Sequence, residues 1–366
     1  MNITFVHGAD LHLDSPFQGL DEARAARRRA EQRELLLRLT ELVRASGAQL
    51  LLLSGDLLDS ALAYRETAAL LESCLSACPA RVFLAPGNHD WYGPGSPYAR
   101  LRLPENVHIF TSAAPEAVEL PELGLRVWGC AFHGPESGPL LRGFSVPRQP
   151  GTREIMVLHG ELNPRSAYDP IAPEDIAGSG LTYLALGHNH SASGLRREGR
   201  TYYAWPGCPE GRGFDECGEK GVYLGTLDDA GACTLEFRPL ARRHYHRETL
   251  DLTAGADPAA ALCALLDTGA PEDIWRVYLK GERDAAPDLA ALERAGAERC
   301  FALELRDRTR PRRELWAQAG EDSLRGLFLG RLRRAYESET DEAVRQRIVQ
   351  AVRWGLQALE GGEELP

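Results

Sequence analysis

The sequence contains no run of apolar residues approaching the roughly 20 in succession that a membrane-spanning helix requires. Its first apolar stretch, residues 3–6, is too short for the core of a secretion signal and instead predicts a first strand. Eight cysteines are present, but no two form a Cys-x-x-Cys pair, so a zinc site of the usual spacing is not expected. These features predict a cytoplasmic protein with free thiols and no association with membranes.

The sequence also lacks an excess of positive charge. Lys and Arg total 42 against 53 Asp and Glu, which gives a formal net charge of −11. This balance argues against a protein that grips nucleic acid from any side through a basic surface. The same charge balance is compatible with a local basic groove, above all beside bound cations that offset the negative charge around them.

What is present is an ordinary globular composition, 43% hydrophobic and 26% charged, over 366 residues. That length exceeds one ordinary core, so we expect two domains or one large domain with appendages.

The first two thirds of the chain alternate short apolar runs with helical patterns. Apolar runs separated by helices predict buried central strands, and the later strands without helices between them predict a second, antiparallel sheet. We therefore expect an α/β fold over residues 1–240, with two sheets packed face to face between outer helices, an αββα sandwich. The expected helices are 23–45 and 66–77, and the expected strands are 2–7, 50–54, 81–85, 125–130, 155–159, 183–187, 201–205, 222–227 and 234–239.

The pattern changes near residue 240. Residues 241–310 read as strand, helix, strand, helix, strand, with the helices at 258–266 and 287–294, which predicts a small α/β cap domain. A basic, proline-containing segment at 306–313 follows. Two further helices, at 314–336 and 341–359, are expected in a C-terminal segment that spans 311–366.

Both C-terminal helices carry one apolar stripe with charged residues opposite, the pattern of a helix that buries one face. The two helices could pack on each other or on the cap. Because the basic segment would detach them from the cap, we favour docking onto a partner protein. The stripe residues are Leu324, Leu327, Phe328 and Leu332 in the first helix and Val344, Ile348, Val349, Val352, Leu356 and Leu359 in the second.

Residues that can bind metals follow five of the expected strands. Because ligand sites of α/β folds form at strand ends, these residues can converge on one rim. The five motifs are Asp10-Leu11-His12, Gly55-Asp56-Leu57-Leu58-Asp59, Gly87-Asn88-His89-Asp90, His159-Gly160 and Gly187-His188-Asn189-His190.

Carboxylate, imidazole and amide groups without thiolate suit Mn²⁺, Fe²⁺ or Zn²⁺ in an open site. Two such ions, about 3.5–4 Å apart and sharing a carboxylate, can activate a hydroxide and offset the charge that develops on a phosphate. The glycines beside the motifs are expected to let the backbone turn sharply. The candidate ligands are Asp10, His12, Asp56, Asn88, His159, His188 and His190.

In this order the motifs resemble the calcineurin-like metallophosphoesterase superfamily, and the resemblance covers residues 1–240. The opening stretch at 7–16, together with Pro206-Gly207 and Gly211-Arg212, is similar to its DNA-repair exonuclease branch, the SbcD and YhaO type. That branch carries a small α/β cap after the catalytic domain and then a segment that grips an ATPase partner of the SbcC type. The elements expected at 241–310 and 311–366 match this plan in order and size.

The resemblance also implies roles for the motif residues. Asp10, His12, Asp56 and His190 would hold one metal, and Asp56, Asn88, His159 and His188 the other, so that Asp56 bridges both. His89 would face the phosphate and stabilise the transition state or protonate the leaving oxygen. Asp59 stands where some nucleases of the branch have His, and it could orient His89 and favour its protonated form.

Arginines occur at two places where they could contact DNA, and only their position in the sequence indicates their role. Arg212 lies in a glycine-containing loop expected near the metals, where it could clamp a DNA phosphate or instead pair with Asp215 or Glu216. The arginines of the first helix, at 24, 27, 28, 29 and 33, are expected to form a solvated face rather than a DNA patch.

The resemblance implies hydrolysis of DNA in repair, by 3′–5′ exonuclease action, single-strand endonuclease action or both, with Mn²⁺ as the first choice of metal. A phosphatase or phosphodiesterase acting on small molecules or phosphoproteins would use the same ions, and the acidic net charge mildly favours it. A non-catalytic protein with a vestigial site is disfavoured because every ligand position is filled. The cap and the terminal helices favour the nuclease, and the sequence leaves open whether two copies form a homodimer.

Overall fold

The computed structural model describes residues 2–60, 63–147, 151–253, 257–283, 286–311 and 315–359. The chain divides into two compact units. The first comprises Met1–Glu248, Leu266–Arg276 and Ala297–Glu304, and the second comprises Thr249–Leu265, Val277–Gly296 and Leu305–Pro366. The expected division into three segments, at 1–240, 241–310 and 311–366, stays a prediction.

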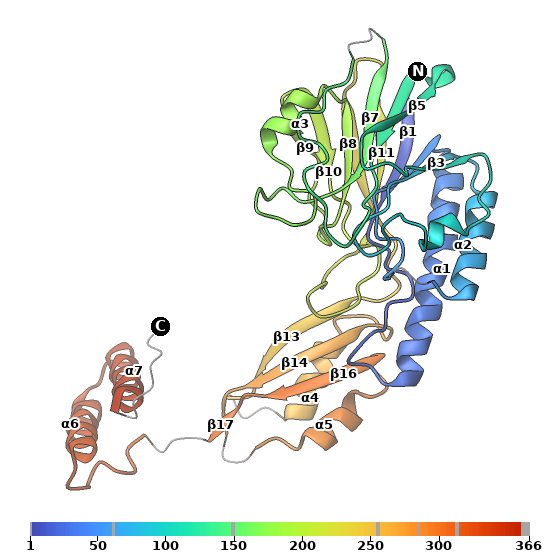
Figure 1. The fold of residues 1–366 in the computed structure, drawn as a ribbon. Helices are drawn as coiled ribbons and strands as arrows, with labels where there is room; N and C mark the ends of the chain where they lie inside the picture. The colour runs from blue at the N-terminus through green and yellow to red at the C-terminus, as the bar shows by residue number, and fades with distance from the viewer. Residues whose placement is uncertain are drawn as a thin grey trace. The chain divides into compact units, whose positions relative to one another are not determined.

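Two six-stranded sheets form the body of the first unit (Figure 1). The first sheet has the order β12-β11-β1-β2-β3-β4, in which β1 to β4 run parallel to one another, β11 runs antiparallel to β1, and β12 runs antiparallel to β11. Its strands are β1 (Ile3–Gly8), β2 (Leu50–Leu53), β3 (Arg81–Leu84), β4 (Val107–Ile109), β11 (Gly221–Leu227) and β12 (Cys233–Pro239).

The second sheet has the order β5-β6-β7-β8-β10-β9, and its four central strands run parallel. The expected antiparallel sheet is therefore wrong. The chain crosses from β6 to β7 without a helix in the described residues of that connection, so the sequence carries no helical pattern to mark the crossover. The strands are β5 (Glu116–Leu120), β6 (Leu125–Gly129), β7 (Arg153–His159), β8 (Tyr183–Gly187), β9 (Arg196–Glu198) and β10 (Thr201–Ala204).

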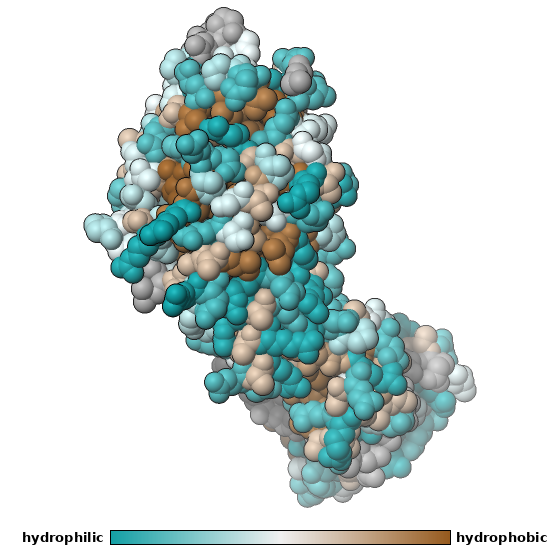
Figure 2. Space-filling model, turned by 90° about the vertical axis from the view of Figure 1, so that its right-hand side faces the viewer, coloured by the Kyte–Doolittle hydropathy of each residue, from teal (hydrophilic) through white to brown (hydrophobic). Residues whose placement is uncertain are grey.

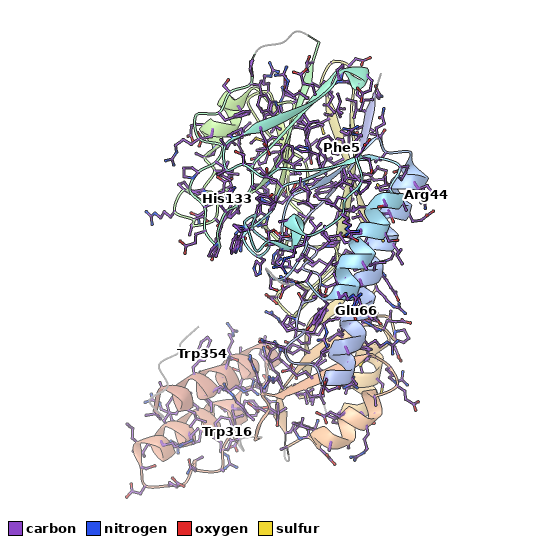
Figure 3. The ribbon with its side chains drawn as sticks, turned by 45° about the vertical axis from the view of Figure 1, so that its right-hand side comes forward. Phe5, Arg44, Glu66, His133, Trp316 and Trp354 are labelled. Carbon is purple, nitrogen blue, oxygen red and sulfur yellow. The ribbon has the colours of Figure 1, made fainter. Side chains whose placement is uncertain are left out.

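Apolar side chains fill three layers, as the leucine run of β2 illustrates. Leu50 and Leu52 belong to the core between the two sheets, which also contains Phe5, labelled in Figure 3. Leu51 and Leu53 point to the opposite face, into the core under helices α1 (Glu22–Ser46) and α2 (Arg65–Ala77). Each fully buried leucine contributes about 1.5–3 kcal/mol, and burial on both faces explains the unbroken apolar run.

The second sheet is covered on its outer face by helix α3 (Pro173–Ser179), whose Ile176 shares a buried cluster with Met156, Leu158 and Leu184. Helices thus lie outside both sheets, and the expected αββα sandwich is confirmed.

The two helices over the first sheet have favourable ends. The Asp21 side chain accepts a hydrogen bond from the Arg24 backbone amide at the start of α1, and Gly47 ends that helix with φ of 64°. Arg44 in the last turn of α1 and Glu66 in the first turn of α2 both complement the helix dipoles (Figure 3).

The chain next builds a three-stranded sheet of order β13-β14-β16. Helices α4 (Pro258–Leu266) and α5 (Leu289–Gly296) separate its strands along the chain, so the expected alternation of strand and helix is confirmed. The strands are β13 (Tyr245–Asp251), β14 (Ile274–Lys280) and β16 (Ala302–Asp307).

The basic segment expected to be a linker is partly strand. Arg310–Pro311 forms β17, which pairs with β15 (Glu282–Arg283), while residues 312 and 313 lie outside the described part of the chain. Helix α6 (Leu324–Ser338) begins ten residues later than the 314 expected, after the capping side chain of Ser323. Residues 315–320 form turns instead.

Helices α6 and α7 (Glu342–Leu359) pack on each other. Leu329, Val352 and Leu356 are buried between them, with Phe328 and Leu332 packed alongside. This is the pairing that the sequence left as an alternative to partner docking. Several apolar side chains stay exposed, namely Leu324 (72%), Leu327 (67%), Trp354 (49%) and Leu359 (43%).

No helix in the described ranges is both long and apolar enough to cross a membrane. On the face drawn in Figure 2, hydrophilic residues dominate and apolar residues reach the surface only in separate patches.

Candidate metal centre

The seven candidate ligands lie at the carboxyl ends of strands in both sheets. Asp10 and His12 follow β1, Asp56 follows β2 and Asn88 follows β3, whereas His159 is the last residue of β7. His188 and His190 follow β8, the parallel neighbour of β7. The two sheets meet at this edge, because His159 Nδ1 lies 2.8 Å from the carbonyl oxygen of Ser54, one residue beyond β2.

The donor atoms converge in two overlapping groups. In the first, His12 Nε2 lies 3.2 Å from His190 Nε2, and Asp10 joins both within 4.8 Å. In the second, His159 Nε2 lies 2.9 Å from Asn88 Oδ1, which is 3.3 Å from His188 Nδ1.

Asp56 lies between these groups. Its Oδ2 is 3.7 Å from His12 Nε2 and 3.4 Å from His159 Nε2. The structure therefore brings all seven candidates together, with Asp56 between the two groups.

The backbone is strained at four of these residues. Asp10, His12, Asp56 and His188 have φ of 54°, 43°, 51° and 92°, in the left-handed region that residues with a Cβ avoid. Such positions cost on the order of 1–3 kcal/mol each and persist only where their surroundings hold them. Here the Asp10 and His12 amides donate to the carbonyls of Gly55 and Asp56, so the two loops lock each other.

A buried carboxylate organises the same loops. Asp90 accepts hydrogen bonds from the backbone amides of Asp56, Leu57, Leu58 and Gly87, and from the Tyr98 hydroxyl. Burial and the nearby charge of Asp56 raise the pKa of Asp90 to about 6. Asp90 therefore builds the turns that present Asp56 and Asn88.

The glycines beside the motifs serve mainly to make room. Of the four glycines beside the motifs, at 55, 87, 160 and 187, only Gly55 has a positive φ, of 86°. A Cβ at Gly87 would collide with the Asp56 carboxylate, and one at Gly187 would collide with the carbonyl of Ser54. The expected sharp turn is thus correct at Gly55, while close approach explains Gly87 and Gly187.

In three histidines the ring nitrogen that faces away from the centre, Nδ1, lies close to an oxygen that can only accept a hydrogen bond. His159 Nδ1 meets the Ser54 carbonyl at 2.8 Å and His190 Nδ1 meets the Glu216 carboxylate at 2.8 Å. His12 Nδ1 lies 3.2 Å from Asp59 Oδ1, an ion-pair distance outside hydrogen-bond geometry. Where the carbonyl or carboxylate accepts the proton of Nδ1, Nε2 turns a lone pair inward. At His190 the Arg212 guanidinium competes as a donor, because its Nη2 lies 3.1 Å from the same Nδ1.

The inward lone pairs face other acceptors, because Asp56 Oδ2 and Asn88 Oδ1 occupy the middle of the group. Acceptors that face one another at such distances fit divalent cations between them. The donor set of imidazole, carboxylate and amide, without thiolate, suits Mn²⁺, Fe²⁺ or Zn²⁺.

The electrostatics also favour cations. Burial alone would raise the pKa of Asp56, but the neighbouring His159 holds it well below its usual range. Burial lowers the pKa of His159, yet Asp56 and Asp10 raise it to a net value of about 9. The centre thus has a strong affinity for positive charge, and a metal ion competes with the proton for the same lone pair.

His89 is exposed and is held by backbone contacts. Its amide donates to Asp56 Oδ1 at 2.9 Å, and its Nδ1 lies 3.0 Å from the main-chain carbonyl of Asp59. The expected pairing of His89 with the Asp59 carboxylate is wrong, because that carboxylate contacts His12 and Arg212 instead. One group of possible metal donors contains His89 with His12 and Asp56.

Arg212 makes the internal ion pair that the sequence offered as its alternative role. Its Nη2 lies 2.7 Å from Glu216 Oε1, and its Nη1 lies 3.1 Å from Asp59 Oδ1. Burial would raise the pKa of Glu216, but hydrogen bonds from His190 and Arg212 keep it well below its usual range. A role for Arg212 in holding DNA stays a prediction.

Sequence reasoning named Glu216 only as a possible partner of Arg212 and missed its contact with His190, because no recognisable motif links the two residues. It also missed Tyr168, an exposed ring whose centroid is 4.9 Å from that of His188. An aromatic residue in a loop gives no signal of its own.

Comparison with known proteins points to the same chemistry. The family model described as calcineurin-like phosphoesterase matches residues 3–192, a span that contains every candidate ligand and His89 but not Arg212 or Glu216. The chain is 30% identical over 279 residues to the uncharacterized metallophosphoesterase YhaO of Bacillus subtilis strain 168, covering 73% of this chain and 67% of the relative. A solved dimetal phosphatase from Danio rerio has 14% identity and a TM-score of 0.40, over 61% of this chain and 92% of its own, too weak a likeness for further conclusions.

Proposed function

This chain belongs to the calcineurin-like phosphoesterases, and on that premise we propose that it is a two-metal nuclease whose substrate is DNA. Metal-dependent hydrolysis of a phosphate ester is the family's chemistry. The nucleic-acid substrate, the preference for Mn²⁺, a role in DNA repair and an ATPase partner are the parts proposed.

Each candidate ligand is assigned to one or both of two metal ions. Asp10, His12, Asp56 and His190 would hold one ion, and Asp56, Asn88, His159 and His188 the other. When bound, the two ions supply an activated nucleophile and offset the charge that develops on the phosphate.

His89 complements this charge stabilisation. Because the Asp59 carbonyl occupies its Nδ1, Nε2 is the nitrogen left to donate to the phosphate or to protonate the leaving oxygen. Its amide contact to Asp56 Oδ1 fixes the ring beside the candidate bridging carboxylate.

The choice of DNA rests on what the chain adds to the catalytic sandwich. A three-stranded α/β unit and a helix pair follow it, and hydrolysis of a small phosphate ester needs neither. The exposed ring of Tyr168 offers a face on which a base could stack beside His188. A phosphatase acting on small molecules or phosphoproteins is the second candidate, favoured by the net charge of −11.

An assay in Mn²⁺ separates these candidates. Purified protein is given single-stranded oligonucleotides, blunt duplexes labelled at either end, a chromogenic phosphodiester and a chromogenic phosphomonoester. We expect cleavage of DNA and of the diester, suppressed by chelation and restored by Mn²⁺. Rapid hydrolysis of the monoester with intact DNA would identify a phosphatase and refute the nuclease.

The helix pair α6–α7 is proposed to bind a coiled-coil ATPase of the SbcC type. Its two helices pack on each other through Leu329, Val352 and Leu356. Leu324 and Leu327 nevertheless remain 72% and 67% exposed. Exposed apolar side chains spaced along one helix suit a helix-to-helix contact.

Truncation after residue 313 is therefore expected to leave metal binding and Mn²⁺-dependent cleavage intact while abolishing co-purification with the ATPase. A full-length variant with Leu324→Asp and Leu327→Asp should lose the partner in the same way, whereas Glu337→Gln on the same helix should keep it. A truncated protein that unfolds, or an aspartate variant that still binds the ATPase, would contradict the assignment.

A further inference from the structure

Five side chains form a closed ring around one half of the centre. His12 Nδ1 lies 3.2 Å from Asp59 Oδ1, which lies 3.1 Å from Arg212 Nη1. Arg212 Nη2 lies 2.7 Å from Glu216 Oε1, which lies 2.8 Å from His190 Nδ1. The ring closes where His12 Nε2 and His190 Nε2 face each other at 3.2 Å.

The ring is shielded and anchored. The Glu216 side chain is 5% exposed and that of Arg212 is 19% exposed, so their contacts are largely out of water. Glu216 also accepts the backbone amide of Arg212 at 2.7 Å. Lys220 Nζ donates to the carbonyl of His190 at 3.0 Å, which fixes the backbone of that histidine as well as its ring.

We propose that Asp59, Arg212 and Glu216 act as a bracket that orients His12 and His190 and thereby sets the affinity of one metal position. The proposal rests on the metal roles given above to these two histidines. Glu216 Oε1, at 2.8 Å, is closer to His190 Nδ1 than Arg212 Nη2 is, at 3.1 Å, so the carboxylate keeps the proton on Nδ1 and Nε2 stays a ligand atom. Asp59 holds His12 through the ion-pair contact at its Nδ1. The guanidinium joins the two carboxylates and keeps both from turning inward to the metal.

The bracket acts on one position because the histidines of the other are held differently. His159 Nδ1 donates to the main-chain carbonyl of Ser54. The Nε2 atom of His188 lies 3.8 Å from the Glu161 carboxylate, which is beyond hydrogen-bonding distance. Loss of Glu216 should therefore weaken one ion and spare the other. In this arrangement Asp59 and Arg212 are positioning residues.

The test is a titration of the full-length, metal-free chain with MnCl₂, followed by calorimetry for affinity and by electron paramagnetic resonance for pairing of the ions. The wild type should bind two Mn²⁺ that give the signal of a coupled pair. Glu216→Gln and Glu216→Ala should bind one Mn²⁺ normally and the second about 10–100-fold more weakly. At one equivalent the signal should be that of an isolated ion.

Glu219→Gln is the matched control, because Glu219 is an exposed carboxylate on the same loop and should leave both affinities unchanged. Arg212→Ala should weaken the same ion as Glu216→Ala, and the double variant should lose little more than either single variant, as members of one unit do. Thermal unfolding of each metal-free variant checks that the fold is retained, and the Gln variant preserves the volume of the side chain.

Three results would overturn the bracket: Glu216 variants with both wild-type affinities, equal weakening of both ions, or additive losses in the double variant. A wild-type chain that binds no Mn²⁺ would instead refute the proposed function on which the bracket rests.

Discussion

Replacing Asp56 with Asn is expected to abolish hydrolysis and to reduce bound metal. The substitution keeps the size of the side chain but removes the charge that lies 3.4 Å from His159 Nε2 and 3.7 Å from His12 Nε2. Loss of a residue around a metal ligand costs about 10–100-fold in affinity, and loss of a bridging ligand should exceed that. Elemental analysis and the cleavage rate in Mn²⁺ measure the two effects.

Asp215→Asn, a neutralised carboxylate at an exposed position, is the matched control and should retain both metal and activity. Two full equivalents of metal in an active Asp56→Asn protein would contradict the bridging role. Folding should survive the change, because an amide oxygen can still accept the hydrogen bond that the His89 amide donates to Oδ1.

Replacing His89 with Ala is expected to separate chemistry from binding. The metals and the affinity for DNA should remain, while the single-turnover cleavage rate at saturating Mn²⁺ should fall about 10²–10⁴-fold, as for a general acid or base. The backbone contact of residue 89 to Asp56 does not depend on the imidazole, so the loop should keep its shape.

His133→Ala is the control for this variant, because His133, labelled in Figure 3, is also exposed and its Nε2 lies 2.9 Å from the main-chain oxygen of Thr111. It should cleave at the wild-type rate. Loss of metal from His89→Ala would place His89 among the ligands, which its proximity to His12 and Asp56 allows.

Much of the sandwich was predictable from local pattern. The leucines of β2 are buried on both faces, and such strands read as unbroken apolar runs. The ligands were predictable because they directly follow those runs, and parallel strands such as β1 and β2 end at the same edge.

Contacts between distant residues were not predictable. Arg28 was expected on a solvated face, yet it is fully buried, because Glu210, 182 residues further on, accepts its hydrogen bond. Helical periodicity places a residue on a face but does not show what covers that face.

The same limit applies at the centre. His12 and Arg212 both contact the Asp59 carboxylate, whereas His89 contacts the main-chain carbonyl of Asp59. The spacing of the motif predicted that Asp59 lies near the site, but it did not show which side chain the Asp59 carboxylate contacts.

The most direct test of the two-metal centre is a crystal structure of the wild-type chain with Mn²⁺, with the ions located by anomalous scattering. We predict two peaks about 3.5–4 Å apart, one against His12 and His190 and one against His159 and His188, with Asp56 between them. A single peak, or two peaks without Asp56 between them, would contradict the account.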